Sequence, residues 1–394
     1  MTKKPDAPAI RFKGFSDAWE QRKVGEVSES YSGGTPSVGV KEYYGGQIPF
    51  IRSAEINSEI TELFLTEEGL KNSSARLVAV GDILYALYGA TSGEVGRARL
   101  KGAINQAILA IKPHTDYDSE YLAQWLRKSK HSIIETYLQG GQGNLSGTIV
   151  KELSVDFPSL KEQKAIGDFF RQLDNLITLH QRKFEKLTNV KKSMLEKMFP
   201  QNGCSYPEIR FKGFTDAWEQ RKLSEITDKV TEKNAGLQYV ETFTNSAEFG
   251  IISQRDFFDH DIAKLGSLDG YYIVKNEDFV YNPRISTSAP VGPINRNKLG
   301  RTGVMSPLYT VFRPHDIDTT YLEYFFKCGY WHSFMNFNGD SGARSDRFSI
   351  RDNVFFQMPI PIPDIDEQRK IGELLTCLDN LITLHQRKHL RLHP

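Results

Sequence analysis

The sequence predicts a mixed α/β protein in which two tandem globular domains are each followed by a long helix, and the two helices pair as an antiparallel coiled coil. Three observations predict this arrangement. Two segments of the chain are repeated, a helix-capping pattern and a periodic apolar stripe accompany the second repeat, and short apolar runs alternate with glycine and proline clusters elsewhere. A chain of 394 residues is long enough to bury a core in each domain.

The repeats define the domain organisation. Residues 10–23 (IRFKGFSDAWEQRK) and 209–222 (IRFKGFTDAWEQRK) differ at one position of fourteen, and residues 173–183 and 378–388 both read LDNLITLHQRK. The paired segments lie 199 and 205 residues apart, so one unit is used twice in tandem. The sequences between the repeats have diverged. A constant frame that carries two variable domains is therefore predicted.

The second repeat lies inside a predicted long helix in each half. Ser159–Glu162 and Asp364–Glu367 have the spacing of a capping box, which places Glu162 in a helix cap. Apolar residues then recur at spacings of three and four. This predicts a helix over 162–198 that is roughly 55 Å long and a shorter one in the last part of the sequence.

The two apolar stripes match each other, which favours pairing of the helices. The expected interface residues are Ile166, Phe169, Leu173, Leu176, Phe184, Leu187, Ile371, Leu374, Leu378 and Leu381. The alternative is that each helix packs on its own globular domain.

Domain boundaries follow from these elements. The predicted parts are a first domain over 1–158, a central helix and linker over 159–200, a second domain over 201–363 and a C-terminal helix over 364–394. Within the domains, strands are expected at 83–87, 107–111, 279–281 and 309–312, and helices at 119–138 and 319–335.

Composition excludes several classes of protein. The 50 basic and 49 acidic residues give a net charge of +1, which excludes a uniformly basic nucleic-acid coat but allows local basic patches. The three cysteines lie far apart and predict neither a disulfide framework nor a zinc site. There is no apolar stretch of transmembrane length and no secretory signal pattern. A soluble protein of the reducing cytoplasm is expected, without a membrane partner and without a bound metal.

Motifs for catalysis are missing from the sequence. It contains no phosphate-binding loop, no glycine-rich turn of the dinucleotide or S-adenosylmethionine type and no zinc-protease motif. Asn282-Pro283-Arg284 has the first two residues of an amino-methyltransferase motif but not its second proline or its aromatic residue. We therefore expect no catalytic residues, and a self-sufficient methyltransferase is disfavoured.

Basic residues are concentrated in matching parts of the two halves. Residues 95–115 and 279–315 contain no acidic residue, and each stretch accompanies a Thr-Ser pair. Arginines beside small hydroxyl and amide residues suit contacts to phosphates and base edges. The candidate DNA-binding residues are Gly34, Thr35, Arg52, Thr91, Ser92, Arg97, Arg99, Asn105, Gln142 and Asn144 in the first half, and Arg284, Thr287, Ser288, Arg296, Lys298, Arg301, Arg344 and Arg347 in the second.

The chain resembles the specificity subunits of type I restriction–modification systems. The resemblance rests on the repeated openings 10–23 and 209–222, on the repeated ends 158–183 and 363–388, and on the order of domain, long helix, domain, long helix. It also includes short segments of the first half that resemble a target-recognition domain, namely Ser32–Thr35, Ile48–Phe50, Ala90–Arg97 and Asn105-Gln106.

The resemblance implies a non-catalytic, DNA-reading subunit of a larger enzyme. Double-stranded DNA, two modification subunits and restriction subunits are the implied partners. S-adenosylmethionine would be bound by the modification subunits, and ATP and Mg²⁺ by the restriction subunits, so no cofactor is expected on this chain. The competing hypothesis is a coiled-coil scaffold without a DNA role, which explains the repeats but not the matching basic stretches.

Overall fold

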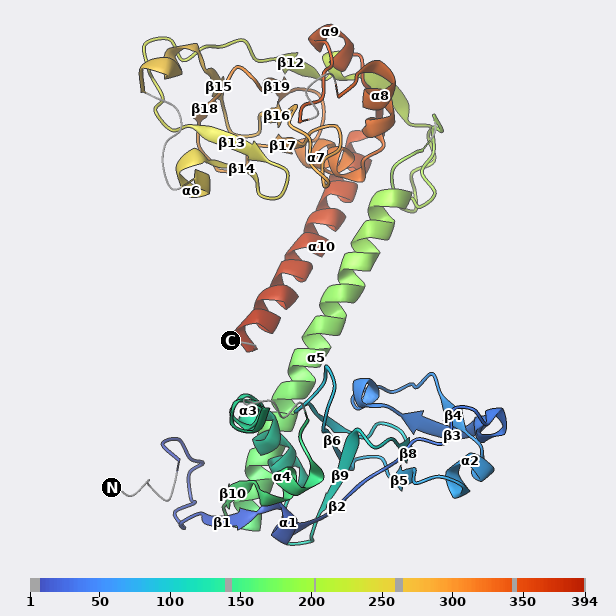
Figure 1. Cartoon of the computed structure of the whole chain (residues 1–394). Coiled ribbons are helices and arrows are strands. Elements are labelled where there is room, and N and C mark those ends of the chain that lie inside the picture. Colours follow the sequence, from blue (N-terminus) through green and yellow to red (C-terminus); the bar gives the residue numbers. More distant parts are fainter. Residues whose placement is uncertain (1–7, 139–143, 202, 259–264, 342–345, 393–394) are drawn as a thin grey trace. The chain divides into compact units, whose positions relative to one another are not determined.

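The computed structural model describes residues 8–138, 144–201, 203–258, 265–341 and 346–392. The chain divides into two compact units, residues 1–178 and 179–394 (Figure 1). The long helix α5 (Leu160–Lys197) begins in the first unit and ends in the second. Among the described helices, none combines the length and the apolar character of a membrane span.

The first unit combines two four-stranded sheets with helices. Its strands are β1 (Glu20–Lys23), β2 (Ser28–Ser32), β3 (Tyr44–Ile51), β4 (Phe64–Leu65), β5 (Arg76–Val78), β6 (Ile83–Ala86), β7 (Val95–Arg97), β8 (Gly102–Ile104), β9 (Ile108–Pro113) and β10 (Ser154–Phe157). Its helices are α1 (Val24–Val27), α2 (Glu67–Lys71), α3 (Ser119–Leu138), α4 (Gly147–Glu152) and the start of α5. One sheet has the strand order β2-β9-β6-β7 and the other β4-β3-β8-β5.

The second unit repeats the first of these sheets. Its strands are β11 (Glu219–Lys222), β12 (Thr227–Lys229), β13 (Phe243–Ser246), β14 (Gly250–Ser253), β15 (Tyr272–Val274), β16 (Phe279–Tyr281), β17 (Ile294–Arg296), β18 (Gly303–Met305), β19 (Thr310–Pro314) and β20 (Pro359–Ile362). Its helices are the end of α5 and α6 (Gln254–Phe258), α7 (Thr319–Cys328), α8 (Trp331–Asn338), α9 (Asp352–Phe355) and α10 (Ile365–Leu392). The order β12-β19-β16-β17 reproduces β2-β9-β6-β7.

The frame of each unit is built the same way. Strand β1 pairs antiparallel with β10, with Glu20 opposite Phe157, and β11 pairs with β20, with Glu219 opposite Ile362. The two glutamates hold the same position in the first repeat. The predicted duplication of one mixed α/β fold, with long helices after each copy, is therefore confirmed. The divergence is concentrated in β3–β5 and β8 of the first unit and in the two-stranded sheets β13–β14 and β15–β18 of the second.

A buried ion pair joins the two repeats within each unit. Arg11 binds Glu162 through Nε and Nη2 at 2.7 and 2.6 Å, and Arg210 binds Glu367 in the same way at 2.8 and 2.8 Å. Both glutamate side chains are buried. The interpretation of Glu162 as a capping residue is wrong, because its carboxylate binds the arginine of the first repeat instead.

The helix pair lies within the second unit. His180 contacts His385, and Lys191 binds Asp379, so residue numbers rise along α5 as they fall along α10 (Figure 1). Leu187, Val190, Met194 and Leu195 of α5 and Leu374 of α10 pack on a core that contains Ile371, Leu375 and Leu378. The predicted antiparallel pairing is confirmed for this part of α5.

Not every predicted seam residue lies in this core. Leu381 is 37% exposed, and its neighbour Ile382 is half-buried instead. In the first unit, Ile166 packs on that unit's own core, as the alternative hypothesis expected. Phe169 and Leu176 are 45% and 44% exposed, Leu173 is half-buried, and in the second unit Phe184 is half-buried.

The predicted helix over 319–335 is two helices. α7 ends at Cys328, and Gly329 follows with a φ of 76°, a left-handed conformation that ends helices. The expected helix 119–138 has the bounds of α3, and the expected strands correspond to β6, β9, β16 and β19.

Candidate nucleic-acid interface

Two loops meet on the surface of each unit. In the first, the amide of Leu145 donates a hydrogen bond of 2.9 Å to the carbonyl of Leu87, in the connection between β6 and β7. In the second, the amide of Phe348 donates one of 2.7 Å to the carbonyl of Pro283, in the connection between β16 and β17. Leu87 and Pro283 hold equivalent positions after equivalent strands. We name these pairs, residues 87–94 with 144–146 and residues 282–293 with 346–350, the loop pairs.

The loop pair of the second unit is basic and rich in hydroxyl groups. Arg284 and Arg347 face each other in an isolated β-bridge, both are exposed, and neither has an ion pair among the described residues. Ser286, Thr287 and Ser288 are exposed beside them. Free guanidinium groups next to hydroxyl groups suit contacts to phosphate oxygens and to guanine edges. The structure thus brings together four predicted residues, namely Arg284, Thr287, Ser288 and Arg347.

An asparagine network fixes this loop pair on the fold. The Nδ2 atom of Asn282 donates to the carbonyl of Asn245 at 2.8 Å, and that of Asn295 donates to Oδ1 of Asn245 at 2.7 Å. Asn245 is buried on β13 and donates to the carbonyl of Val280 at 2.7 Å. The sequence analysis missed Asn245 and Asn282, because neither residue is basic and Asn245 lies outside the acid-free stretch.

The loop pair of the first unit has different side chains. Tyr88 stands at the position of Arg284, Thr91 and Tyr88 are half-buried, and Asn144 is exposed. Ser92 donates a hydrogen bond of 3.1 Å to the carbonyl of Leu87, which helps to shape the turn. Thr91, Ser92 and Asn144 therefore belong to the same loop pair. Gln142 of the first half and Arg344 of the second fall outside the described residues.

A second group of predicted residues lies at the turn between β8 and β9. Thr35 donates to Oε1 of Gln106 at 2.6 Å, and Oδ1 of Asn105 accepts from the amide of Ala107 at 3.2 Å. Gly34 is buried, and a Cβ atom there would lie 1.9 Å from Oγ of Ser74. Gly34 is thus required for close packing, while Thr35 and Gln106 are exposed.

Most other predicted basic residues bind acidic residues, some of them close in the sequence and others distant. Arg52 binds Glu55 and Glu62, and these hydrogen bonds raise its pKa. Arg97 lies 3.8 Å from Glu120, and burial lowers its pKa. The remaining pairs are Arg99 with Glu59 at 3.6 Å and Arg301 with Glu241 at 2.7 Å. The acid-free stretches therefore do not form acid-free surfaces.

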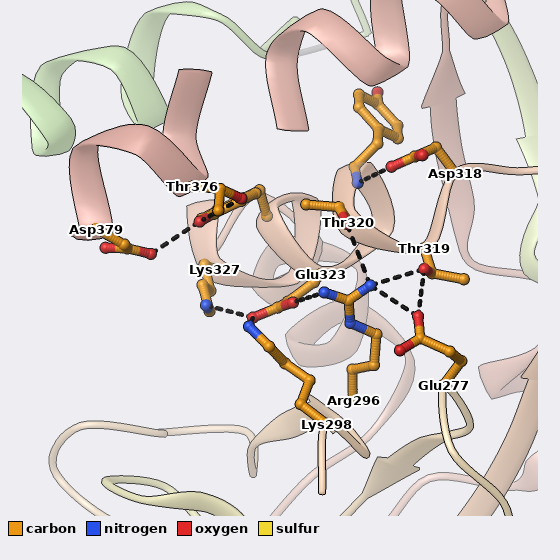
Figure 2. A network of polar contacts seen from close by, with 12 residues as sticks. Glu277, Arg296, Lys298, Asp318, Thr319, Thr320, Glu323, Lys327, Thr376 and Asp379 are labelled. Carbon is orange, nitrogen blue, oxygen red and sulfur yellow. Dashed lines mark hydrogen bonds and ion pairs between the residues drawn. The ribbon is translucent and has the colours of Figure 1, made fainter. Parts of the chain in front are cut away.

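Arg296 and Lys298 belong to an ion-pair network that joins β17 to α7 (Figure 2). Arg296 is 8% exposed and binds Glu323 at 2.6 Å, Glu277 at 2.9 Å and Oγ1 of Thr319 at 2.7 Å. Lys298 and Lys327 also bind Glu323, at 3.3 and 2.6 Å. Burial opposes ionisation of Glu323, but the surrounding cations hold its pKa below the usual value. Arg296 is enclosed by protein, in contrast to Arg284 and Arg347.

No group of three or more histidine, cysteine, aspartate or glutamate side chains in the described ranges is arranged to hold a metal ion. On the described surface of the second unit, two arginines and several hydroxyl groups come together at the loop pair. A duplicated frame that carries two divergent loop pairs, together with a helix pair, is typical of a recognition protein.

Comparison with known proteins identifies the family. Residues 16–189 and 215–393 match the type I restriction modification DNA specificity domain, and the chain belongs to this family. Its function is to supply DNA sequence specificity in a type I restriction–modification system, so the scaffold hypothesis is not favoured. The two matched ranges correspond to the two halves of the duplication.

Relatives in archaea and bacteria cover the chain to different extents. The MjaVIII specificity subunit of Methanocaldococcus jannaschii is 23% identical over 385 residues, which is 94% of this chain and 88% of that protein. The EcoR124I/EcoR124II specificity subunit of Escherichia coli is 24% identical over 167 residues, which is 40% of this chain and 41% of that protein. The crystal structure of the S subunit from M. genitalium has the same fold, with a TM-score of 0.59 and 13% identity over 99% of this chain and 96% of that one.

Proposed function

We propose that each unit reads one half of a bipartite DNA target and that its loop pair makes the base contacts. The observation that carries this proposal is the contrast between the two loop pairs. Their backbones are joined by equivalent hydrogen bonds, but one carries Arg284 and Arg347 and the other carries Tyr88 and Asn144. Equivalent surfaces with different side chains suit two different half-sites.

The helices would act as a ruler between the two readers. In this proposal the helices set the length of the unread spacer in the DNA, which should therefore be fixed in length but free in sequence. A separation of about 34 Å corresponds to one turn of DNA. The boundaries near residues 158, 200 and 363, which would separate the DNA-reading domains from the long helices, remain predictions.

In the DNA-contacting set that we propose, Thr91, Ser92 and Asn105 are half-buried and the other members are exposed. Arg284, Thr287, Ser288 and Arg347 read one half-site, and Thr35, Thr91, Ser92, Asn105 and Asn144 read the other. Arg52, Arg97, Arg99, Lys298 and Arg301 would contact phosphates only by exchanging their present acidic partners. Gln142 and Arg344 remain candidates from the sequence.

Two modification subunits are the proposed partners of the long helices. Leu176 and Leu381 hold the same position of the second repeat and are both exposed, at 44% and 37%. Beside Leu381, a groove along α10 is lined by Asp318, Gly372, Thr376, Asn380 and Leu384. The same exposed residues in both repeats suit two copies of one partner. Adenine methylation with S-adenosylmethionine would take place on those subunits, and ATP-driven cleavage with Mg²⁺ on restriction subunits, all in the cytoplasm.

Mapping of methylated bases tests the reading scheme. The chain and its modification subunits are expressed together, and methylated adenines are sequenced in the host genome. Two short motifs separated by a spacer of constant length are expected. Replacement of residues 24–157 by the same region of a relative should change only one motif. A continuous motif, a variable spacer or a change in both motifs would contradict the proposal.

A further inference from the structure

The candidate DNA surface of the first unit has no charge of its own. Every residue that we propose for the first half-site is uncharged, and the predicted arginines of this unit bind acidic side chains. Basic residues that neutralise phosphates supply the sequence-independent part of the affinity for DNA. A free basic residue beside the uncharged ones would supply this part of the affinity in the first unit.

Arg76 is an exposed basic residue where the two sheets of the first unit meet. Its guanidinium carbon lies 3.9 Å from the centre of the Tyr31 ring, which is a cation–π contact, and Arg76 has no ion pair among the described residues. The hydroxyl group of Tyr31 donates a hydrogen bond of 2.8 Å to the carbonyl of Leu77, so the edge strands β2 and β5 lie side by side (Figure 1). The ring orients the guanidinium group without neutralising its charge.

Arg76 lies next to the candidate residues at the turn between β8 and β9. It pairs with Ile104 across β5 and β8, and the carbonyl of Ile104 accepts a hydrogen bond of 3.2 Å from the amide of Gly34. The residues that follow Gly34 and Ile104 in the sequence are Thr35 and Asn105, which belong to the proposed DNA-contacting set. The stacked arginine and these two residues are therefore neighbours in the fold.

The second unit has the same kind of contact at the equivalent place, but with the partners exchanged. Strands β15 and β18 correspond to β5 and β8, because both pairs are antiparallel with a valine opposite a glycine at the same point, and Tyr272 thus holds the position of Arg76. The Lys233 ammonium lies 3.3 Å from the centre of the Tyr272 ring. Lys233 follows β12, the counterpart of β2, and it is exposed without an ion pair in the described ranges.

The tyrosine of this second contact borders the loop pair. Tyr272 lines a hollow of about 390 Å³ together with Pro283, Arg347 and Ser349 of the loop pair. Lys233 is stacked on the ring that forms part of the wall of this hollow. A stacked cation thus lies beside the candidate DNA surface in each unit.

We propose that Arg76 and Lys233 each hold a phosphate group of the DNA backbone beside the half-site that their unit reads. The proposal rests on the DNA-reading function and adds the residues that position the backbone. The loop pairs differ between the units, but the stacked cation is present in both. This suits recognition of the backbone, which is chemically the same in both half-sites, because phosphate contacts fix position without selecting bases.

The salt dependence of DNA binding tests the inference in the complex of the chain with its modification subunits. The duplex carries the target found by methylation mapping. We expect Arg76→Ala and Lys233→Ala each to reduce the slope of log affinity against log salt by about one, and the double variant by about two. Arg76→Lys should retain the slope of the parent, because the charge is kept. The methylated motif should be the same for all of these variants.

Lys370→Ala is the matched control. The Lys370 ammonium lies 4.7 Å from the centre of the Phe214 ring, and Lys370 is exposed without an ion pair among the described residues, but it belongs to α10 and not to a DNA-reading domain. Its variant should keep the slope of the parent. An unchanged slope with Arg76→Ala or with Lys233→Ala, an equal loss with Lys370→Ala, or a changed motif would overturn the inference.

Failure of the loop-pair proposal would give a different result. In that case Arg284→Ala with Arg347→Ala would leave the affinity and the motif unchanged, while Arg76→Ala would still reduce the salt slope. If the loop pairs read DNA but the stacked cations do not contact it, the loop-pair variant would lower affinity and Arg76→Ala would keep the slope of the parent. The two measurements therefore separate the inference from the function on which it rests.

Discussion

The Nδ1 atoms of His180 and His385 lie 2.9 Å apart across the pair formed by α5 and α10. Both histidines hold the same position of the repeated LDNLITLHQRK segment. Their contact therefore marks the point at which the two repeats cross in opposite directions. A hydrogen bond between these atoms requires that one ring donates and the other accepts, so it is compatible with at most one protonated ring.

The histidine contact predicts a pH dependence of helix pairing. Burial lowers the pKa of His385, and the neighbouring His180, Lys183 and Lys388 lower it further. The unfolded chain then binds protons more readily than the folded pair, so stability falls as the pH drops through and below about 6.5. The melting temperature should decrease between about pH 7 and pH 5.5. His385→Gln should flatten this dependence, and an unchanged slope would contradict the assignment.

Removal of the two free arginines should weaken DNA binding. Arg284→Ala with Arg347→Ala should lower affinity and, if both contact phosphates, reduce the slope of log affinity against log salt by about two. Binding to the target is measured at several salt concentrations. Arg22→Ala is the matched control, because Arg22 is exposed on β1 and bound to Glu20, away from the loop pairs. If Arg22→Ala lowered DNA affinity as much as the double variant, the proposal that DNA binds at the loop pair of the second unit would be contradicted.

Arg296→Ala should lower the stability of the second unit. Its loss leaves the buried carboxylate of Glu323 with fewer partners, at a cost of about 3 kcal/mol in the free energy of unfolding. Chemical denaturation measures this change. The double variant Arg296→Met with Glu323→Gln should recover part of it, because the buried charge is then absent. A stability equal to that of the parent, combined with a large loss of DNA affinity, would instead assign Arg296 to the DNA surface.

Two leucines of α5 should behave differently when replaced by aspartate. Leu187 packs on the core of the second unit, so Leu187→Asp should cost more than the roughly 1.5–3 kcal/mol of apolar burial. Leu176→Asp should leave unfolding unchanged but weaken assembly with the modification subunits. Denaturation and size-exclusion chromatography of the co-expressed complex separate these effects. Unfolding caused by Leu176→Asp would show that the exposed leucine has a structural role.

The repeats made the architecture predictable. Two pairs of nearly identical segments about 200 residues apart indicate a duplicated fold, and this inference does not depend on helix or strand propensities. The heptad assignment was less accurate in detail. Leu381 fits a seven-residue spacing, but the seam passes through Ile382. The set that contains Leu375 and Ile382 also recurs at spacings of three and four, so spacing alone does not decide which of the two sets is the more buried.

The candidate site was harder to predict from sequence. A stretch without acidic residues indicates nothing about acids that the fold brings to it. Glu323 reaches Arg296 from α7, and Glu241 reaches Arg301 from 60 residues away. Only Arg284 and Arg347 keep free guanidinium groups among the candidates that the structure describes in the second unit. Both arginines lie on loops that pair with each other, and the order of charges along the sequence does not show which loops pair.

The ion pairs Arg11–Glu162 and Arg210–Glu367 have a genetic consequence. Each pair lies at the boundary of a variable domain, and Arg11 and Arg210 lie in nearly identical segments. Homologous recombination between such segments in related genes would exchange a whole DNA-reading domain and still place an arginine opposite its glutamate. The recombinant protein would then keep an unchanged frame around a new variable domain, so one crossover exchanges many surface residues that would otherwise require many substitutions.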